Sequence, residues 1–280
     1  MHEKLKFIHI GYHRCGSTTL QTDVFACTRS LSCAKDPNLA TNNQKSFNDV
    51  NWFNKPPLDH SHPHYFAVSA ESLCGVNYSS HQPSKTFSSL PSKIHRNWPN
   101  AQILIVFRRQ PDLIKSYYSL ALRKSQLTIS LNEYASSFFP YAYLEYDKLI
   151  STYLSLFRSE QVLAIPAEFL FKHQTEAINT LSNHLGVALD APNLKRRNAA
   201  NTKAGLLVLR QCNRALQTLG FNGHHEWLKR YLLRSSVFVR VGGRSELDAD
   251  VEMSIRHHFR DSNERCSELT GYNLIDDYGY

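Results

Sequence analysis

The feature that most constrains this chain is a short apolar run followed at once by a glycine-bounded loop. Residues 7–10 read Phe-Ile-His-Ile, and residues 11–20 read Gly-Tyr-His-Arg-Cys-Gly-Ser-Thr-Thr-Leu. A strand that feeds such a loop and then a helix points successive backbone N–H groups at an anion. Nucleoside triphosphatases place a lysine directly after the second glycine, where it reaches the β- and γ-phosphates. Here Ser17 holds that position and the cation is Arg14, so we expect a phosphate loop without the lysine that a γ-phosphate requires.

A second strand-to-helix junction lies further along the chain. Residues 103–107 read Ile-Leu-Ile-Val-Phe and run directly into Arg108 and Arg109. A continuous apolar run suits a parallel strand covered on both faces, and Pro111 fits the first turn of a helix, where its missing N–H is not needed. Guanidinium groups are rigid, always charged and suited to phosphate oxygens, and the Ser116 hydroxyl can add a donor. We therefore expect a second phosphate site here, in place of the magnesium-binding Asp that often ends such a strand in nucleotide hydrolases.

Two separate phosphate sites without metal-binding residues match a nucleotide phosphorylated at both its 5′ and 3′ positions. The motifs resemble those of PAPS-dependent sulfotransferases, PAPS being 3′-phosphoadenosine 5′-phosphosulfate. In that family a Gly-x-x-(Lys/Arg)-x-Gly-(Ser/Thr)-(Ser/Thr)-x-Leu loop binds the 5′-phosphosulfate, and residues 11–20 follow this pattern. An Arg followed eight residues later by Ser binds the 3′-phosphate, and Arg108 and Ser116 stand at that separation.

The resemblance extends to a bacterial, carbohydrate-type branch of the family, through Gln110, Asp112, Tyr118 and the ending at residues 262–280. It implies an α/β, P-loop-type three-layer fold with a central, mostly parallel sheet flanked by helices and a helical C-terminal portion. It also implies metal-independent transfer of a sulfuryl group from PAPS to a carbohydrate or glycolipid hydroxyl, leaving adenosine 3′,5′-bisphosphate; small phenols and peptide tyrosines stay open as acceptors. The implied donor-binding residues are Gly11, Tyr12, His13, Arg14, Cys15, Gly16, Ser17, Thr18, Thr19, Arg108 and Ser116.

Three residues are candidates for the chemistry. Arg14 would neutralise the bridging oxygen and the 5′-phosphate as the sulfuryl group leaves, by charge and hydrogen bonding, because guanidinium stays protonated. His13 could share that work, with an ordinary loop histidine as the alternative. Glu71 follows the apolar residues 65–69 at the C-terminal end of an expected strand, which is the ligand edge of an open α/β sheet. Because related sulfotransferases place a base near the acceptor hydroxyl, Glu71 is the candidate general base, with a capping or ion-paired carboxylate as the alternative.

Other polar segments give weaker signals. Arg197 and Asn198 resemble a basic-Asn segment that approaches the nucleotide in the family, so they are further candidate donor-binding residues. Residues 241–245 read Val-Gly-Gly-Arg-Ser, and an ordinary turn is favoured over a loop that covers the 3′-phosphate. Histidines at 60, 62 and 64 alternate, but Pro63 interrupts them and no matching ligand cluster lies nearby in the sequence. We therefore expect no metal site.

Composition limits the partners and the location. The 280 residues carry a formal net charge of +8 and a pI near 9.2, which suits polyanionic ligands without choosing among nucleic acid, membrane surface, glycan and nucleotide. The six cysteines form no regular framework, so we expect reduced thiols. The sequence shows no signal-peptide pattern and no run near the roughly 20 apolar residues of a membrane helix. We expect a cytoplasmic protein of bacterial origin without a membrane span.

The pattern along the chain predicts a single domain over residues 1–280. Residues 30–64 are polar, without a clean period, and are interpreted as a long insertion or lid. Residues 200–280 are expected to be mainly helical, and the aromatic residues of 131–158 mostly core, although those at 134–146 could also stack on sugar rings. Strands are expected at 4–10, 65–69, 103–107 and 162–165, and helices at 17–26, 86–97, from Pro111 onward, at 172–185, 204–219 and 249–270.

Two other functions compete with sulfuryl transfer. A P-loop kinase or nucleoside triphosphatase with a degenerate loop is disfavoured by the missing lysine after Gly16 and by the arginines that follow Phe107. A nucleic-acid-binding protein would use the basic surface, but the sequence lacks a recognisable helix-turn-helix, zinc-finger or RNA-binding signature. The expected partner is therefore an acceptor substrate, not a nucleic acid.

Overall fold

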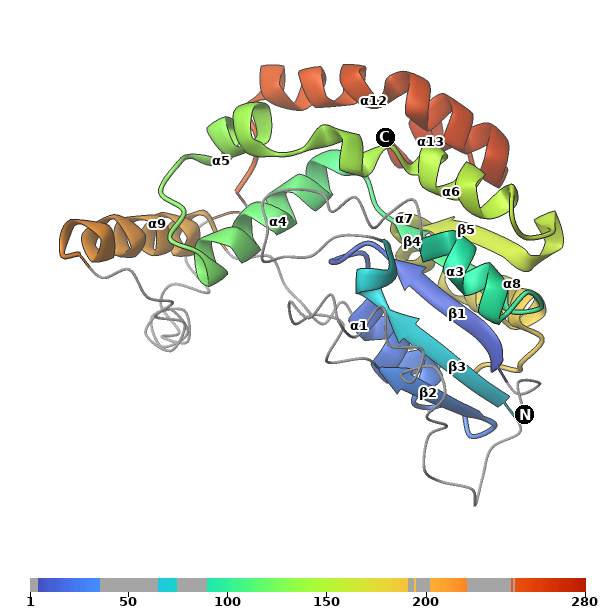
Figure 1. Cartoon of the computed structure of the whole chain (residues 1–280). Coiled ribbons are helices and arrows are strands. Elements are labelled where there is room, and N and C mark those ends of the chain that lie inside the picture. The colour runs from blue at the N-terminus through green and yellow to red at the C-terminus, as the bar shows by residue number, and fades with distance from the viewer. Residues whose placement is uncertain are drawn as a thin grey trace. The chain divides into compact units, whose positions relative to one another are not determined.

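The chain falls into two compact units by the contacts within its backbone. The computed structural model describes residues 5–35, 65–74, 90–190, 194, 202–220, 243 and 245–280 (Figure 1). Unit 1 comprises Met1–Arg109, Pro140–Arg197 and Arg260–Tyr280, and unit 2 comprises Gln110–Phe139 and Asn198–Phe259. The single domain expected from the sequence stays a prediction.

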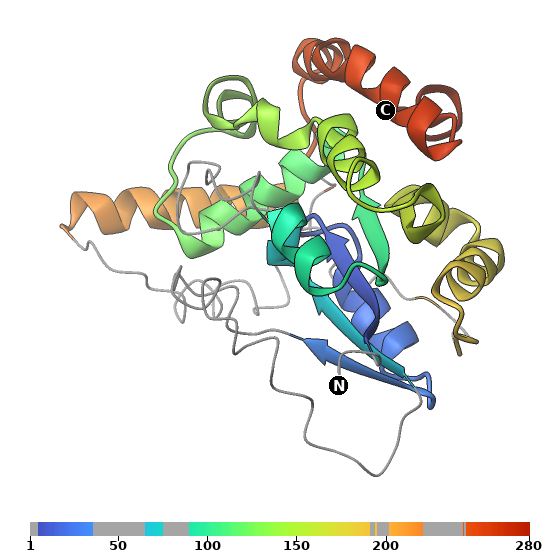
Figure 2. The ribbon, with the colours of Figure 1, turned by 45° about the vertical axis from the view of Figure 1, so that its right-hand side comes forward.

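Unit 1 is organised around a five-stranded sheet in which every neighbouring pair is parallel (Figures 1 and 2). The strand order is β2-β3-β1-β4-β5, so the strand that precedes the phosphate loop is central. The four strands expected from apolar runs are confirmed as β1, β3, β4 and β5, and with them the α/β fold class. The strands are β1 (Leu5–Gly11), β2 (Leu31–Lys35), β3 (Tyr65–Ala70), β4 (Gln102–Phe107) and β5 (Val162–Pro166).

Strand β2 corrects one expectation, because it lies within the segment 30–64 that we interpreted as an insertion. It pairs in parallel with β3, from Leu31 beside Tyr65 to Lys35 beside Ser69. Its sequence, Leu-Ser-Cys-Ala-Lys, contains no β-branched or aromatic residue, so its own strand propensity is low. The ladder to β3 holds it at the sheet edge. Residues 36–64, with the three alternating histidines, lie outside the described residues.

Both faces of the sheet are covered. Residues 7–10 of β1 are at most 1% exposed, although successive side chains of a strand point to opposite faces. Residues 103–107 of β4 are fully buried as well. The apolar runs therefore predicted the environment of these two strands correctly.

Helices make up most of the rest of the described part of unit 1. The helix expected at 172–185 is confirmed as α8, which ends where Gly186 takes a left-handed φ of +60°, and the short helix α7 precedes it. The imidazole Nε2 of His184 lies 3.3 Å from the carbonyl oxygen of Ile103, which links α8 to β4. The helices are α1 (Ser17–Thr19), the π-helix η1 (Leu20–Phe25), the 3-10 helix η3 (Glu71–Cys74), α3 (Leu90–Asn97), η6 (Tyr141–Leu144), α6 (Tyr146–Leu154), η7 (Ser159–Gln161), α7 (Ala167–Lys172), α8 (Gln174–Leu185) and α13 (Leu274–Tyr278).

A buried carboxylate fixes the unit 1 part of helix α12 (Ala249–Thr270) to α6. The side chain of Asp147 is only 8% exposed. Its Oδ1 accepts a hydrogen bond from the Ser262 hydroxyl, and its Oδ2 accepts one of 2.8 Å from Nε of Arg265. Because a buried carboxylate is costly without partners, these two contacts specify where α12 packs in unit 1.

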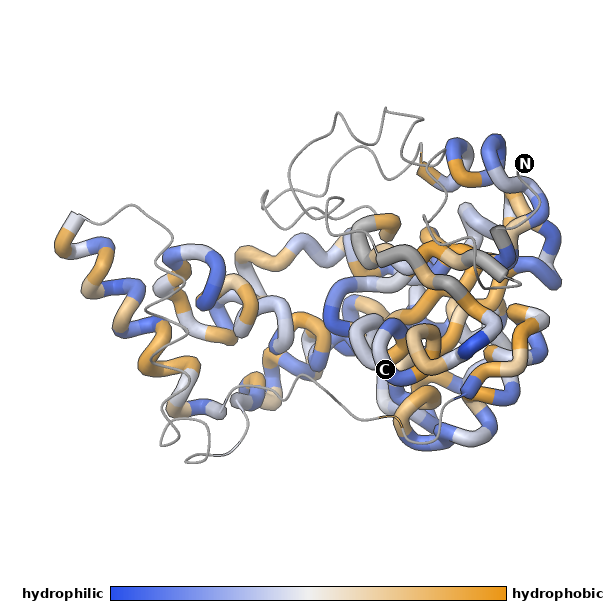
Figure 3. Tube along the Cα trace, turned by 90° about the horizontal axis from the view of Figure 1, so that it is seen from below, coloured by the Kyte–Doolittle hydropathy of each residue, from blue (hydrophilic) through white to orange (hydrophobic). Residues whose placement is uncertain are grey.

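The regular elements in the described part of unit 2 are helices. Buried Asn213 ties α9 to the chain at the end of α4, because its Nδ2 donates to the carbonyl oxygens of Leu122, at 3.1 Å, and Leu127, at 2.7 Å. Along α9, hydrophobic and hydrophilic residues alternate as an amphipathic helix requires (Figure 3). The helices of unit 2 are α4 (Gln110–Lys124), α5 (Leu131–Glu133), the π-helix η5 (Tyr134–Phe138), α9 (Lys203–Thr218) and the first part of α12.

Four of the eight aromatic residues of 131–158 are core residues, and three others are half-buried. Tyr143, Tyr146, Tyr153 and Phe157 are each at most 7% exposed. Phe138 in unit 2 differs, because 59% of it is exposed. This ring is therefore an apolar surface and not a part of the core.

Asp147→Ala should lower the free energy of unfolding by about 2–4 kcal/mol, because the Ser262 hydroxyl would be left buried without its acceptor. Urea unfolding followed by circular dichroism measures this change. The matched control is Asp261→Ala, at an exposed position of the same helix, which should change stability by less than about 0.5 kcal/mol. Equal losses in the two variants would contradict a structural role for the buried carboxylate.

Candidate active site

The register of the sheet brings four chain segments to one edge of unit 1. Gly11 of β1 lies beside Val106 of β4. The pairing of β1 with β3 ends at Ala70, and the pairing of β4 with β5 ends at Pro166. The strands are parallel, so the residues that follow these positions all leave the sheet at its carboxyl edge. This is the edge at which open α/β sheets bind ligands.

The loop after β1 has a tight, left-handed backbone. The amide of Cys15 donates to the carbonyl of Tyr12 over 3.2 Å and closes a turn. Arg14 has a φ of +73° and Gly16 a φ of +95°. A left-handed conformation is costly for an arginine and persists only where the surroundings enforce it, which is common at functional sites. When left-handed and right-handed residues alternate along a loop, neighbouring backbone N–H groups point toward the same side. An anion-binding loop requires this arrangement.

Both loop glycines have close neighbours, and Gly16 also has a left-handed backbone angle. A Cβ on Gly16 would lie 3.1 Å from Cε2 of the Phe171 ring. A Cβ on Gly11 would lie 3.1 Å from both Nε2 of His9 and Oγ of Ser17. A larger residue at either position would require these neighbouring side chains to shift.

Ser17, which follows the second glycine, has the side chain that best fits an anion in this loop. It is 1% exposed, and its Oγ has no hydrogen-bond partner among the described residues. A buried hydroxyl without a partner is costly, and a phosphate oxygen would satisfy it. The amide of Leu20 donates to the carbonyl of Gly16 over 3.0 Å, so the helical turn that carries Ser17 begins directly at the loop.

The other loop residues divide between the core and the surface. Tyr12 is 1% exposed, and its ring packs against Tyr143 and Tyr146, with centroids 5.1 and 4.8 Å apart. Burial raises the pKa of Tyr12 well above its usual value, so the phenol stays protonated. Cys15 is fully buried, whereas His13 and Arg14 are half-buried and Thr18 is exposed. Tyr12 therefore anchors the loop, and the polar groups for a ligand come from its neighbours.

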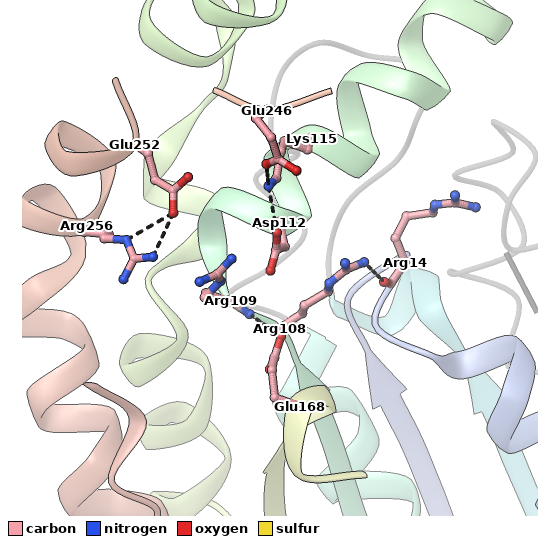
Figure 4. A network of polar contacts seen from close by, with 9 residues as sticks. All are labelled: Arg14, Arg108, Arg109, Asp112, Lys115, Glu168, Glu246, Glu252 and Arg256. Atoms are coloured by element: carbon pink, nitrogen blue, oxygen red, sulfur yellow. Dashed lines mark hydrogen bonds and ion pairs between the residues drawn. The ribbon is translucent and has the colours of Figure 1, made fainter. Parts of the chain in front are cut away.

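Arg108 makes direct contact with the phosphate loop. Its Nη1 donates to the carbonyl oxygen of Arg14 over 3.2 Å, although the two residues are far apart in the sequence (Figure 4). Figure 4 also shows the Arg14 guanidinium pointing away from this contact. Arg108 therefore contacts the loop of residues 11–16 at the carboxyl edge of the sheet.

Ser116 lies in α4 of unit 2 and is half-buried. The neighbouring Lys115 pairs with Asp112 at 3.0 Å and with Glu246 at 2.6 Å. Burial lowers the pKa of Lys115, but the Glu246 and Asp112 carboxylates outweigh it and raise the pKa above its usual value. The ammonium group therefore stays protonated between these two carboxylates.

The remaining candidates are only partly described. Glu71 is the first residue of η3, directly after β3, and η3 packs against β1; the side chain of Glu71 lies outside the described part of the structure. Arg197 and Asn198 also lie outside the described residues, as does most of 241–245. Among the residues that the structure describes, no group of three or more His, Cys, Asp or Glu side chains is placed to hold a metal ion. In the same part of the chain, no helix has the length and apolar character needed to cross a membrane.

Comparison with known proteins decides the family. A family model described as a sulfotransferase domain matches residues 5–206, which is more than half of the chain. The chain belongs to the sulfotransferase domain family. Its fold is similar to the crystal structure of a sulfotransferase from Alicyclobacillus acidocaldarius, with a TM-score of 0.62, 13% sequence identity and 97% of each chain covered.

Two further findings delimit this relationship. The mouse sulfotransferase SULT7A1 complexed with PAP matches with 14% identity over 82% of this chain and 89% of that chain. Its TM-score of 0.44 is too low to establish a shared fold. No curated protein matches the sequence. The family and the fold are therefore shown, and the donor and the acceptor of this sulfotransferase have to be inferred from its own residues.

Two groups at the site of this sulfotransferase were missed in the sequence. Beneath the loop, Nδ1 of His9 lies 2.7 Å from Oγ of Ser69, and Nε2 of Gln21 donates to the same Oγ over 2.9 Å. These contacts fix the end of β3 two residues before Glu71. Only the strand pairing places His9 beside Ser69, so no local pattern could have revealed the contact.

Glu168 is the second missed residue. It follows β5 at the carboxyl edge, and its Oε1 accepts from the backbone N–H of Arg109 over 3.2 Å. Burial raises the pKa of Glu168 above its usual value, against the opposing effect of the Tyr280 hydroxyl and the Arg108 charge. Its position after an expected strand was a signal that the sequence did offer.

Gly16→Ala should destabilise this sulfotransferase by about 2–5 kcal/mol, because left-handed strain adds to crowding against Phe171. The control is Gly271→Ala, which has a similar φ of +76° but open space around the added Cβ. That control should cost only about 1–2 kcal/mol. Chemical unfolding of both variants measures the difference, and equal losses would show that the Phe171 contact does not constrain the loop.

Proposed function

We propose that this sulfotransferase moves a sulfuryl group from PAPS to an acceptor hydroxyl, by metal-independent in-line transfer. The observation that carries the proposal is the contact between Arg108 and the phosphate loop, because it puts a permanent cation beside a loop that already suits a phosphate. A nucleotide with phosphate groups at both its 5′ and 3′ positions can bind the loop with one phosphate and Arg108 with the other. The missing lysine after Gly16 disfavours a nucleoside triphosphate in the same place.

The residues of the loop suit the 5′-phosphosulfate end of the donor. Ser17 offers a buried hydroxyl that has no partner among the residues the structure describes, and the left-handed residues Arg14 and Gly16 shape the backbone between the strand and the helix. Thr18 and Thr19 follow with further donors, and Gly11, His13 and Cys15 complete the loop. On the 3′ side, the proposal assigns Arg108 and, from the spacing of the motif, Ser116, with Arg197 and Asn198 as additional contacts.

In the proposed reaction the acceptor oxygen attacks sulfur, and the bond from sulfur to the bridging phosphate oxygen breaks. Glu71 takes the proton of the acceptor hydroxyl, and adenosine 3′,5′-bisphosphate leaves with the bridging oxygen. The Arg14 guanidinium stabilises the negative charge that develops on that oxygen, and His13 can assist it. The backbone supports Glu71 in this role, because η3 begins at this residue beside the end of β1.

For the acceptor, we propose a carbohydrate or glycolipid hydroxyl and a cytoplasmic, bacterial setting. The sequence supports a sugar acceptor through the arginine in the loop and the ending that resembles the bacterial, carbohydrate-type branch. The exposed ring of Phe138 offers an apolar face of the kind that stacks on a sugar ring.

The nucleotide preference tests the donor. By calorimetry without magnesium, adenosine 3′,5′-bisphosphate should bind much more tightly than ADP or ATP. Arg108→Ala should weaken the bisphosphate roughly 10- to 150-fold, because a charge-assisted phosphate contact is lost. Arg96→Ala, which removes the same charge at an exposed position of unit 1, should leave the affinity unchanged. Equal affinity for ADP, or binding only with magnesium, would contradict the assignment of the donor.

The base is tested by Glu71→Gln. Turnover should fall by about 100-fold or more, because the amide cannot take the acceptor proton, whereas the affinity for adenosine 3′,5′-bisphosphate should stay within about twofold. Transfer of labelled sulfate from PAPS to a panel of sugar acceptors measures turnover. Glu160→Gln, at an exposed position of unit 1, is the control for the loss of charge. Unchanged turnover in Glu71→Gln would remove this residue from the mechanism.

A further inference from the structure

We propose that Glu168 is a positioning residue for donor binding: together with Tyr146 and Tyr280, it holds the peptide group between Arg108 and Arg109 and thereby aims the Arg108 side chain. This inference rests on the proposed function, in which Arg108 holds the 3′-phosphate. It concerns residues that touch neither the donor nor the acceptor in the mechanism above.

Two side chains hold this one peptide group from its two ends. The hydroxyl of Tyr146 donates to the carbonyl oxygen of Arg108 over 2.6 Å. The N–H of Arg109 donates to Oε1 of Glu168 over 3.2 Å (Figure 4). That carbonyl and that N–H belong to the same peptide plane, so the two bonds together restrict its rotation.

A third side chain fixes the carboxylate itself. The hydroxyl of Tyr280 donates to Oε2 of Glu168 over 2.8 Å, so each oxygen of the carboxylate accepts a hydrogen bond. Burial raises the pKa of both Tyr146 and Tyr280 well above the usual value, which keeps their hydroxyl groups protonated as donors. The Phe107 ring packs against both tyrosines, with centroids 5.1 and 5.9 Å apart.

The peptide group needs this support because the sheet no longer provides it. The ladder between β4 and β5 ends at Phe107 beside Pro166, immediately before Arg108. An arginine side chain is long and loses considerable rotamer freedom when it is fixed. A rigid starting point reduces the freedom that binding must still remove, so the same phosphate contact gives a higher affinity.

The hydrogen bonds also show that Glu168 does not act on the Arg108 side chain by direct contact. Glu168 contacts the backbone of Arg109, whereas the guanidinium of Arg108 donates to the carbonyl of Arg14. The carboxylate therefore acts on Arg108 through the main chain. If this is correct, loss of Glu168 affects recognition of the 3′-phosphate and not recognition of the 5′ end.

The experiment compares the affinities for adenosine 3′,5′-bisphosphate and adenosine 5′-monophosphate by calorimetry. The readout is the ratio of the two dissociation constants, which reports the 3′-phosphate contact alone. Glu168→Ala should reduce the preference for the bisphosphate by about fivefold or more, with the monophosphate affinity unchanged. Tyr280→Phe should reduce it in the same direction by a smaller factor.

Two further variants serve as controls. Glu168→Gln should keep most of the preference, because its amide oxygen still accepts from the N–H of Arg109 and its amide nitrogen can donate to the Tyr280 hydroxyl. Glu176→Ala, an exposed carboxylate on α8, should keep all of it. Where Glu168→Ala does not fold, Tyr280→Phe alone decides, and an unchanged ratio in that variant overturns the inference.

The outcomes distinguish the inference from the function on which it rests. A wild-type protein without preference for the bisphosphate would overturn the proposed function. A wild-type preference that survives in Glu168→Ala would overturn the positioning role and leave the function standing. A parallel loss of affinity for both nucleotides would show a merely structural role and would also overturn the inference.

Discussion

The hydrogen bond from the Arg108 guanidinium to the carbonyl of Arg14 is the contact on which the account of this sulfotransferase depends. It joins two motifs that are far apart in the sequence, and it is possible because β1 and β4 are neighbours with Gly11 beside Val106. The parallel direction of the strands then delivers the loop and the arginine to the same edge. The proposed donor site therefore depends on this register and not on either motif alone.

The buried polar groups near that contact differ in whether they have hydrogen-bond partners within the protein. The left-handed Arg14 and Gly16 shape the loop, and the buried hydroxyl of Ser17 is left for a ligand oxygen. The Asp147 carboxylate and the peptide group after Arg108, by contrast, have their hydrogen bonds satisfied within the protein. Among these residues, the hydroxyl without a described partner is in the loop, where the donor is proposed to bind, and the satisfied groups hold the surrounding structure.

The sequence predicted those parts of the structure that local patterns determine. The apolar runs of β1 and β4, the loop between residues 11 and 16 and the helix that contains Pro111 were all predicted, because burial, glycine and proline leave strong local signals. Strand β2 was missed, since its pairing with β3 and not its own propensity makes it a strand. The contact of His9 depends on a distant segment, which no spacing in the sequence reveals, whereas the place of Glu168 after an expected strand was a usable signal for its position but not for its partner.

Phosphorus NMR of adenosine 3′,5′-bisphosphate tests the central claim most directly, namely that one nucleotide contacts both the loop and Arg108. In magnesium-free buffer, the resonances of the 5′- and 3′-phosphates should both shift when the protein is added. In Arg108→Ala, at a nucleotide concentration that saturates the protein, the 5′ resonance should still shift while the change at the 3′ resonance is largely lost. A wild-type spectrum in which only one of the two resonances responds would contradict the account.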